Sequence, residues 1–150
     1  MLKGIDNRLN AEALYALRAM GHGDTLVLVD TNFPAETVAR QTTFGRVIRM
    51  ENLTTAEAAE AVLSLLPLDT FVEDFALRME VVGDPVAVPP SQAEVQAAID
   101  AAEGPGRRML SIERFAFYEE AKRAYAVIQT GERRFYGCVI FRKGVIPPEA

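Results

Sequence analysis

Two titratable side chains near the start of the chain suit proton transfer and ligand binding. His22 is the only histidine among 150 residues and lies between two glycines. Asp30 directly follows an apolar run and ends an expected buried strand over residues 25–30. An imidazole can give or take a proton near neutral pH, because its unperturbed pKa is about 6.5. A carboxylate at the carboxyl end of a buried strand is where open α/β sheets tend to bind ligands.

The strand between them keeps these two side chains apart in the sequence-based prediction. A strand over residues 25–30 separates its ends by about 20 Å, at roughly 3.3 Å per residue. His22 and Asp30 therefore meet only if the glycine turn folds back or another chain supplies one of them. The ordinary alternatives are that His22 is a cap or surface group at a helix end and that Asp30 forms a turn.

Four more candidates lie in the last third of the chain. Arg114 precedes a group of aromatic side chains, and a guanidinium can donate paired hydrogen bonds to neighbouring hydroxyls. Tyr136, Gly137 and Cys138 begin the last expected strand, where an aromatic ring beside exposed backbone can form a sugar-stacking edge. The alternatives are a solvated arginine at a helix start and, for Cys138, an inert thiol packed in an apolar strand.

Composition excludes several classes of protein. The net charge of −5 and the lack of a basic stripe argue against nucleic-acid binding. The apolar runs are too short to span a bilayer, and the N-terminus lacks the apolar core of a signal peptide, so we expect no membrane partner and a cytoplasmic protein. One histidine and one cysteine cannot build a structural zinc site, and we expect no metal. Nucleotide-binding glycine signatures are missing, so we expect no cofactor. The nucleophile motif GxSxG is also missing, so we do not expect nucleophilic catalysis.

Capping signals and apolar periodicity define the expected elements. Helices are predicted over residues 11–20, 54–66, 91–103 and 113–129. Strands are predicted over residues 25–30, 46–50, 75–82, 108–112 and 137–142, with a turn and an irregular polar stretch after the first. Alternating strands and helices predict an α/β fold, a three-layer α/β/α single domain over residues 1–150 with a mixed sheet.

Several short blocks together carry a resemblance to a known family. They are MLKGI, MGHGD, a strand ending in DTNFPA, ERFAFYE, TGER, and YGC before a strand ending in RKGV. In this order they resemble the ribose pyranase and fucose mutarotase family (RbsD/FucU-like), closest to its fucose mutarotase branch. The similarity runs from Met1 to about Val145, with residues 36–105 more divergent.

The resemblance implies an isomerase that interconverts the α and β anomers of L-fucose or a related monosaccharide without metal or nucleotide. It makes His22 the proton donor and Asp30, Arg114, Tyr136, Gly137 and Cys138 the substrate-binding residues. One departure concerns Cys138, which stands where the family pattern has asparagine. The alternative functions are pyranose to furanose interconversion and non-catalytic sugar binding.

The resemblance also implies a ring-shaped homo-oligomer, commonly a decamer, with sites at subunit boundaries. If the last strand ran parallel to the first, Tyr136 would lie at the opposite end of the sheet from Asp30. Either the last strand is antiparallel to the first, or a neighbouring copy completes the site. With the resemblance added, we favour the neighbouring copy.

Overall fold

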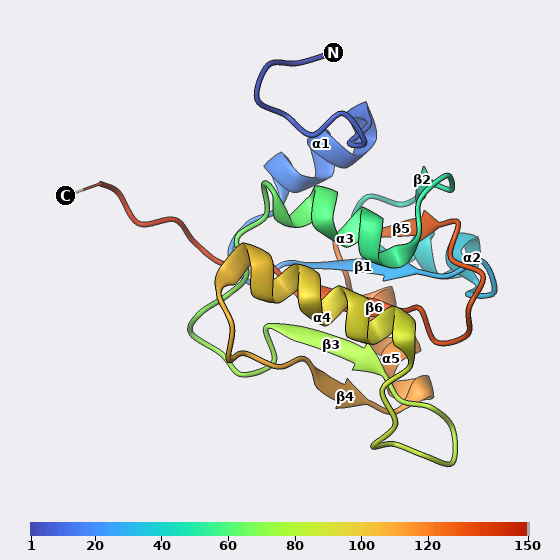
Figure 1. The fold of residues 1–150 in the computed structure, drawn as a ribbon. Helices are drawn as coiled ribbons and strands as arrows, with labels where there is room; N and C mark the ends of the chain where they lie inside the picture. Colours follow the sequence, from blue (N-terminus) through green and yellow to red (C-terminus); the bar gives the residue numbers. More distant parts are fainter. Residues whose placement is uncertain (150) are drawn as a thin grey trace.

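A six-stranded mixed sheet forms the centre of the computed structural model, which describes residues 1–149 (Figure 1). Its strands are β1 (Thr25–Val29), β2 (Val47–Met50), β3 (Ala76–Met79), β4 (Leu110–Ile112), β5 (Ala126–Thr130) and β6 (Val139–Arg142), in the order β2-β5-β1-β6-β3-β4. Strand β6 is antiparallel to both its neighbours, β1 and β3, and the other pairs are parallel. The start of β6 therefore lies beside the carboxyl ends of β1 and β3.

Helices cover both faces of this sheet. One layer holds α1 (Ala11–Ala19), α3 (Thr55–Leu63) and α4 (Pro90–Glu103), and the other holds α2 (Ala35–Ala39) and α5 (Arg114–Lys122). Successive residues of β1 point to opposite faces, so Leu26 and Leu28 pack into the first core while Val27 and Val29 pack into the second. The predicted three-layer α/β/α architecture with a mixed sheet is confirmed.

Two helix starts follow the expected capping chemistry and one does not. The Asn10 side chain accepts from the Ala13 amide, and Thr54 and Glu57 form a reciprocal capping box. Helix α4 instead begins at Pro90, one residue before its predicted start at residue 91, and has no side-chain cap. Proline suits the first helical position because it has no N–H to leave unpaired.

The prediction of one long helix over residues 113–129 is wrong. Helix α5 ends at Lys122, and the chain turns into β5, which pairs with β1 on one side and β2 on the other. The Val, Ile and Thr side chains of β5 favour a buried strand, and tertiary pairing overrides the helical periodicity of this stretch. The short helix α2 lies in the stretch that was expected to be irregular.

No helix within residues 1–149 is both long enough and apolar enough to cross a membrane.

Candidate active site

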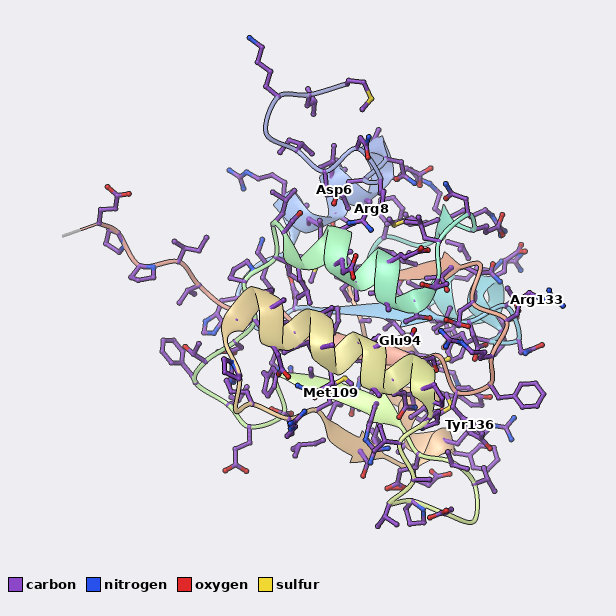
Figure 2. The ribbon with its side chains drawn as sticks, in the orientation of Figure 1. Asp6, Arg8, Glu94, Met109, Arg133 and Tyr136 are labelled. Atoms are coloured by element: carbon purple, nitrogen blue, oxygen red, sulfur yellow. The ribbon has the colours of Figure 1, made fainter. Side chains whose placement is uncertain are left out.

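A pocket of about 190 Å³ opens at the carboxyl end of β1. It is smaller than the roughly 300–1,000 Å³ typical of sites for drug-sized ligands, which suits a single small molecule. Four predicted site residues line it, namely Asp30, Arg114, Tyr136 and Cys138. The other lining residues are Asn32, Phe33, Met79, Tyr118 and Phe135. Figure 2 shows Tyr136 on the side of the molecule toward which the arrow of β3 points.

Asp30 joins the end of β1 to the start of β6. Its side chain is buried, with 4% of the residue exposed. Oδ1 accepts hydrogen bonds from the amides of Asn32 and Phe33 at 3.0 and 3.1 Å, and Oδ2 accepts from the Gly137 amide at 3.1 Å. A carboxylate has about four lone-pair sites, so these three bonds leave capacity for one ligand hydroxyl.

Tyr136 and Gly137 meet Asp30 within one chain because β6 is antiparallel to β1. The reasoning that favoured a neighbouring copy for this part of the site is therefore wrong. Gly137 is needed for its small size, since a Cβ there would lie 2.6 Å from Glu132 Cγ and 3.2 Å from Thr55 Oγ1. Tyr136 has a φ of 62°, which is uncommon for a residue with a side chain, and its hydroxyl accepts from the Val82 amide at 3.2 Å.

Arg114 begins α5, where the Glu113 side chain caps the helix by accepting from two backbone amides. Its Nε donates to the Tyr118 hydroxyl at 2.9 Å, one helical turn later. This bond raises the pKa of the Arg114 guanidinium, so the group is charged at any working pH. The pair gives one wall of the pocket a cation and a phenol side by side.

Cys138 contributes an apolar wall. Only 1% of the residue is exposed, and burial raises the pKa of the thiol well above its usual value. The sulfur is therefore a neutral thiol with weak hydrogen-bonding capacity at the place where the sequence departs from the family pattern.

His22 lies outside this pocket, at the amino-terminal end of β1. Its Nε2 is 3.0 Å from Oδ2 of Asp69, and its ring meets Phe71 edge-on with 5.6 Å between ring centroids. The Phe71 amide, followed by the His22 ring, lowers the pKa of Asp69, so this buried carboxyl is ionised near neutral pH. An ionised Asp69 can only accept, so Nε2 carries a proton and Nδ1 is the ring nitrogen that is left to exchange a proton with a ligand.

The two parts of the predicted site are therefore separated in one chain. The five residues of β1 span about 17 Å at roughly 3.4 Å per residue. The structure brings together Asp30, Arg114, Tyr136, Gly137 and Cys138, and it places His22 with Asp69 at the other end of the sheet.

Comparison with models of known protein families shows to which family this chain is related. The model described as the RbsD / FucU transport protein family matches residues 3–146. The chain belongs to this family. The resemblance read from the sequence blocks is confirmed.

Three similar proteins show how close the chain is to known relatives. A fucose mutarotase of Danio rerio is 44% identical over 157 aligned positions, which cover 99% of this chain and 97% of the relative. A solved structure of a candidate sugar binding protein is 61% identical, with a TM-score of 0.96 over 98% of this chain and 97% of that one. The fucose mutarotase of Streptococcus pneumoniae, solved in complex with L-fucose, is 33% identical, with a TM-score of 0.86 over 97% of this chain and 100% of that one.

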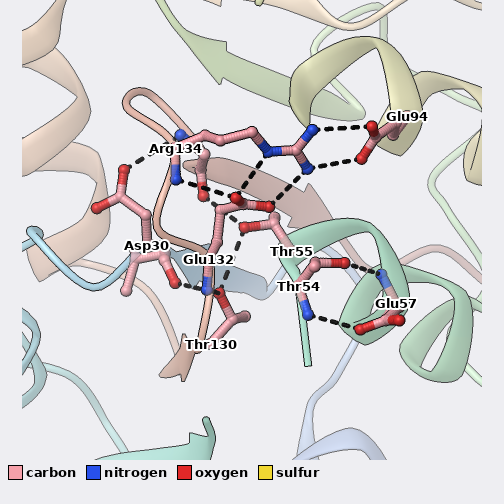
Figure 3. A network of polar contacts seen from close by, with 10 residues as sticks. Asp30, Thr54, Thr55, Glu57, Glu94, Thr130, Glu132 and Arg134 are labelled. Carbon is pink, nitrogen blue, oxygen red and sulfur yellow. Dashed lines mark hydrogen bonds and ion pairs between the residues drawn. The ribbon is translucent and has the colours of Figure 1, made fainter. Parts of the chain in front are cut away.

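The pocket of this RbsD / FucU family member is supported by a partly exposed ionic network at the segment before β6 (Figure 3). Glu132 is buried and accepts from the Arg134 side chain at 2.9 and 3.0 Å, and Arg134 also donates to both carboxylate oxygens of Glu94 on α4. The Arg134 side chain is the main reason that the pKa of Glu132 is lowered. This network ties the loop that carries Tyr136 to helix α4.

Sequence reasoning missed Asp69 as the partner of His22, and Met79, Phe33 and Tyr118 as lining of the pocket. One signal was present for Tyr118, because residues four apart on a helix face each other and Tyr118 follows Arg114 at that spacing. Asp69 had no local signal, since it is 47 residues from His22. The described histidine, cysteine and acidic side chains form no group of three that could hold a metal ion.

Proposed function

We propose that this chain is an L-fucose mutarotase-like isomerase, which interconverts the α and β anomers of L-fucose or a related monosaccharide. The observation that carries the proposal is the small pocket in which a carboxylate, a guanidinium and two phenols converge. Relatives named fucose mutarotase, over nearly the full length of the chain, support the same activity. The complex of a relative with L-fucose supports the choice of sugar.

Binding falls to the residues around the pocket. Asp30 has capacity for one sugar hydroxyl beyond its three backbone bonds. Within residues 1–149 the two terminal nitrogens of Arg114 donate to no protein acceptor, so they suit a pair of adjacent hydroxyls. Phe33, Met79 and Cys138 offer apolar surface to the carbon face of the ring.

The reaction needs one proton donor and one proton acceptor and no net change of charge. The acceptor takes the proton of the anomeric hydroxyl while the donor protonates the ring oxygen, so the bond between C1 and the ring oxygen breaks and an open aldehyde forms. Rotation about C1–C2 presents the other face of the aldehyde, and the same proton transfers run in reverse as the ring closes. We assign His22 the proton donor role, because an imidazole serves general acid and base chemistry near neutral pH.

We infer that a second copy of the chain brings His22 to the pocket. Within one chain His22 and Asp30 lie at opposite ends of β1. Phe71 beside His22 and Phe135 at the pocket are both more than two-thirds exposed, as expected for apolar side chains that an interface covers. A ring-shaped decamer and a cytoplasmic location remain predictions that follow from the family resemblance and the composition.

Nuclear magnetic resonance tests the activity directly. Saturation transfer between the anomeric protons of L-fucose, with and without the protein, measures exchange of the two anomers. We expect the wild-type protein to speed this exchange and a folded His22→Ala variant to remove most of the acceleration. Binding of L-fucose without exchange would make the chain a sugar-binding module. Exchange confined to pyranose and furanose forms of a pentose would make it a pyranase.

A further inference from the structure

Gln92, in the first turn of α4, makes an unusual pair of contacts for a buried side chain. The residue has no exposed surface. Its amide nitrogen Nε2 donates to the backbone oxygens of Met79 at 2.7 Å and of Tyr136 at 2.8 Å. Its oxygen Oε1 accepts from Arg78 Nη1 at 3.2 Å. One amide group thus bonds to backbone of strand β3, to backbone of the segment before β6 and to one cation.

Both backbone partners of Gln92 carry side chains that line the sugar pocket. Met79 is the last residue of β3, and Tyr136 lies in the segment before β6. Met79 and Tyr136 thus form two walls of the pocket. The Gln92 amide bonds to both residues and so helps to set the distance between them. A change in the position of that amide would move both walls relative to each other.

The peptide group between Tyr136 and Gly137 is held from both ends. Its carbonyl oxygen accepts from Gln92, and its N–H donates to Asp30 Oδ2 at 3.1 Å. A peptide group is planar, so fixing the direction of the oxygen also fixes the direction of the N–H. Gln92 therefore orients the hydrogen bond that Asp30 accepts, although it does not touch Asp30 itself.

Tyr136 also needs this support because of its backbone conformation. Its φ of 62° lies in the left-handed region, where a side chain is strained. Such conformations persist only where the surroundings hold them. The contact from Gln92 falls on the carbonyl of this residue and opposes its relaxation.

We propose that Gln92 is a positioning residue for the sugar pocket, which sets the places of Met79 and Tyr136 and aims the Gly137 amide at Asp30. The part of this proposal that concerns the sugar rests on the proposed function. The part that concerns the backbone does not, and the two parts have separate tests.

The chain offers a matched control on the same helix. Gln96 lies one turn later and is also buried. Its amide nitrogen donates to the Arg107 oxygen at 2.7 Å, and its oxygen accepts from the Met109 amide at 2.9 Å. Neither of these partners lines the pocket. Replacing Gln96 by methionine removes a comparable set of buried hydrogen bonds without touching the pocket walls.

The experiment compares Gln92→Met with Gln96→Met in the full-length protein. Thermal unfolding should show that both variants fold with a lowered Tm. Calorimetric titration with L-fucose should show at least about fivefold weaker binding for Gln92→Met, the loss of roughly one hydrogen bond, and a change of less than about twofold for Gln96→Met. Equal affinities in the two variants would overturn the role of Gln92 in the sugar pocket.

A second measurement needs no sugar. Amide hydrogen exchange at Gly137 reports how well its N–H is held on Asp30. It should be faster than wild type in Gln92→Met and unchanged in Gln96→Met, and equal rates in both variants would overturn the backbone part of the proposal. If wild type fails to bind L-fucose, the proposed function fails while this comparison still decides the positioning role.

A third variant covers the case in which Gln92→Met does not fold. Gln92→Asn keeps the amide but is one methylene shorter, so it cannot bond to both backbone oxygens at their present distances. We expect its affinity for L-fucose to be lower than that of wild type but still measurable. We expect amide exchange at Gly137 to be faster than in wild type but slower than if the Gln92 bonds were all lost. Values equal to those of wild type would contradict the proposal.

Discussion

His22 and Asp30 lie at opposite ends of β1. His22 is held by a carboxylate, and Asp30 is held by backbone amides. The His22 ring is 3.0 Å from Asp69, whereas Asp30 accepts from the Gly137 amide at 3.1 Å. The two ends are roughly 17 Å apart along a strand of this length. A site that uses both residues on one sugar therefore needs two copies of the chain.

Mixed oligomers test this arrangement. We expect His22→Ala and Arg114→Ala each to lose most anomer exchange as pure proteins. When the two variants are co-assembled in equal amounts, the Arg114→Ala chain supplies an intact His22 and the His22→Ala chain supplies a pocket with an intact Arg114. In a closed ring, random mixing places these two intact parts together in about a quarter of the sites. Saturation transfer on the co-purified mixture should recover that fraction of the wild-type rate. No recovery in a mixture shown to contain both variants would place the whole site in one chain.

Asp69 gives a prediction on the dependence of stability on pH. Its pKa is lowered in the folded protein, chiefly by the Phe71 amide and then by His22, from an ordinary value of 3.8. A lowered pKa contributes stability that is fully present above the unfolded value and is lost as the pH falls through the folded value. The free energy of unfolding of wild type should therefore exceed that of Asp69→Asn most above about pH 4, and the difference should shrink in more acidic solution.

Urea unfolding of both proteins across the acidic range measures this difference. A difference that grows as the pH falls would contradict the lowered pKa. In the exchange assay, Asp69→Asn should also be slower than wild type by roughly tenfold or more, because the imidazole loses the group that fixes its proton on Nε2.

Cys138 tests the departure from the family pattern. The thiol is buried against the pocket and is a weak donor and acceptor, whereas an asparagine amide offers two donors and an acceptor. We expect Cys138→Asn to bind L-fucose about two- to tenfold more tightly. Wild type should in turn prefer sugars with a less polar group near this position. Titrations with L-fucose and with 6-deoxy and hydroxymethyl sugars check both statements, with Cys138→Ala as control. An identical ranking and identical affinities would mean that the side chain does not reach the ligand.

Gly137→Ala tests how tightly the segment before β6 is packed. The new methyl would lie 2.6 Å from Glu132 Cγ, and Arg134 holds that carboxylate in place. Overpacking of this kind typically costs about 1–3 kcal/mol of stability. We expect a lower Tm together with weaker L-fucose binding, since the Gly137 amide is displaced from Asp30. Gly21→Ala is the control, because a Cβ there meets only Asp24 Oδ2 at 3.8 Å. A Tm as high as that of the control would contradict the close packing.

The sequence by itself determined the local features and the family. Capping at Asn10 and Thr54 depends on residues within one turn, so it can be read from neighbours in the chain. The blocks around His22, Asp30 and Arg114 identified the family because their residue types and order do not depend on knowing the fold.

Only the tertiary structure decided which of these residues meet. The antiparallel direction of β6 brings Tyr136 and Gly137 to Asp30, although they lie more than 100 residues apart in the chain. The tertiary structure also decided that β5 is a strand. Its sequence has helical periodicity, but its residues pair with β1 and β2. Strand direction and strand partners are set by contacts between distant segments, which leave no regular signal in the local sequence. The partnership of His22 with Asp69 was hidden for the same reason.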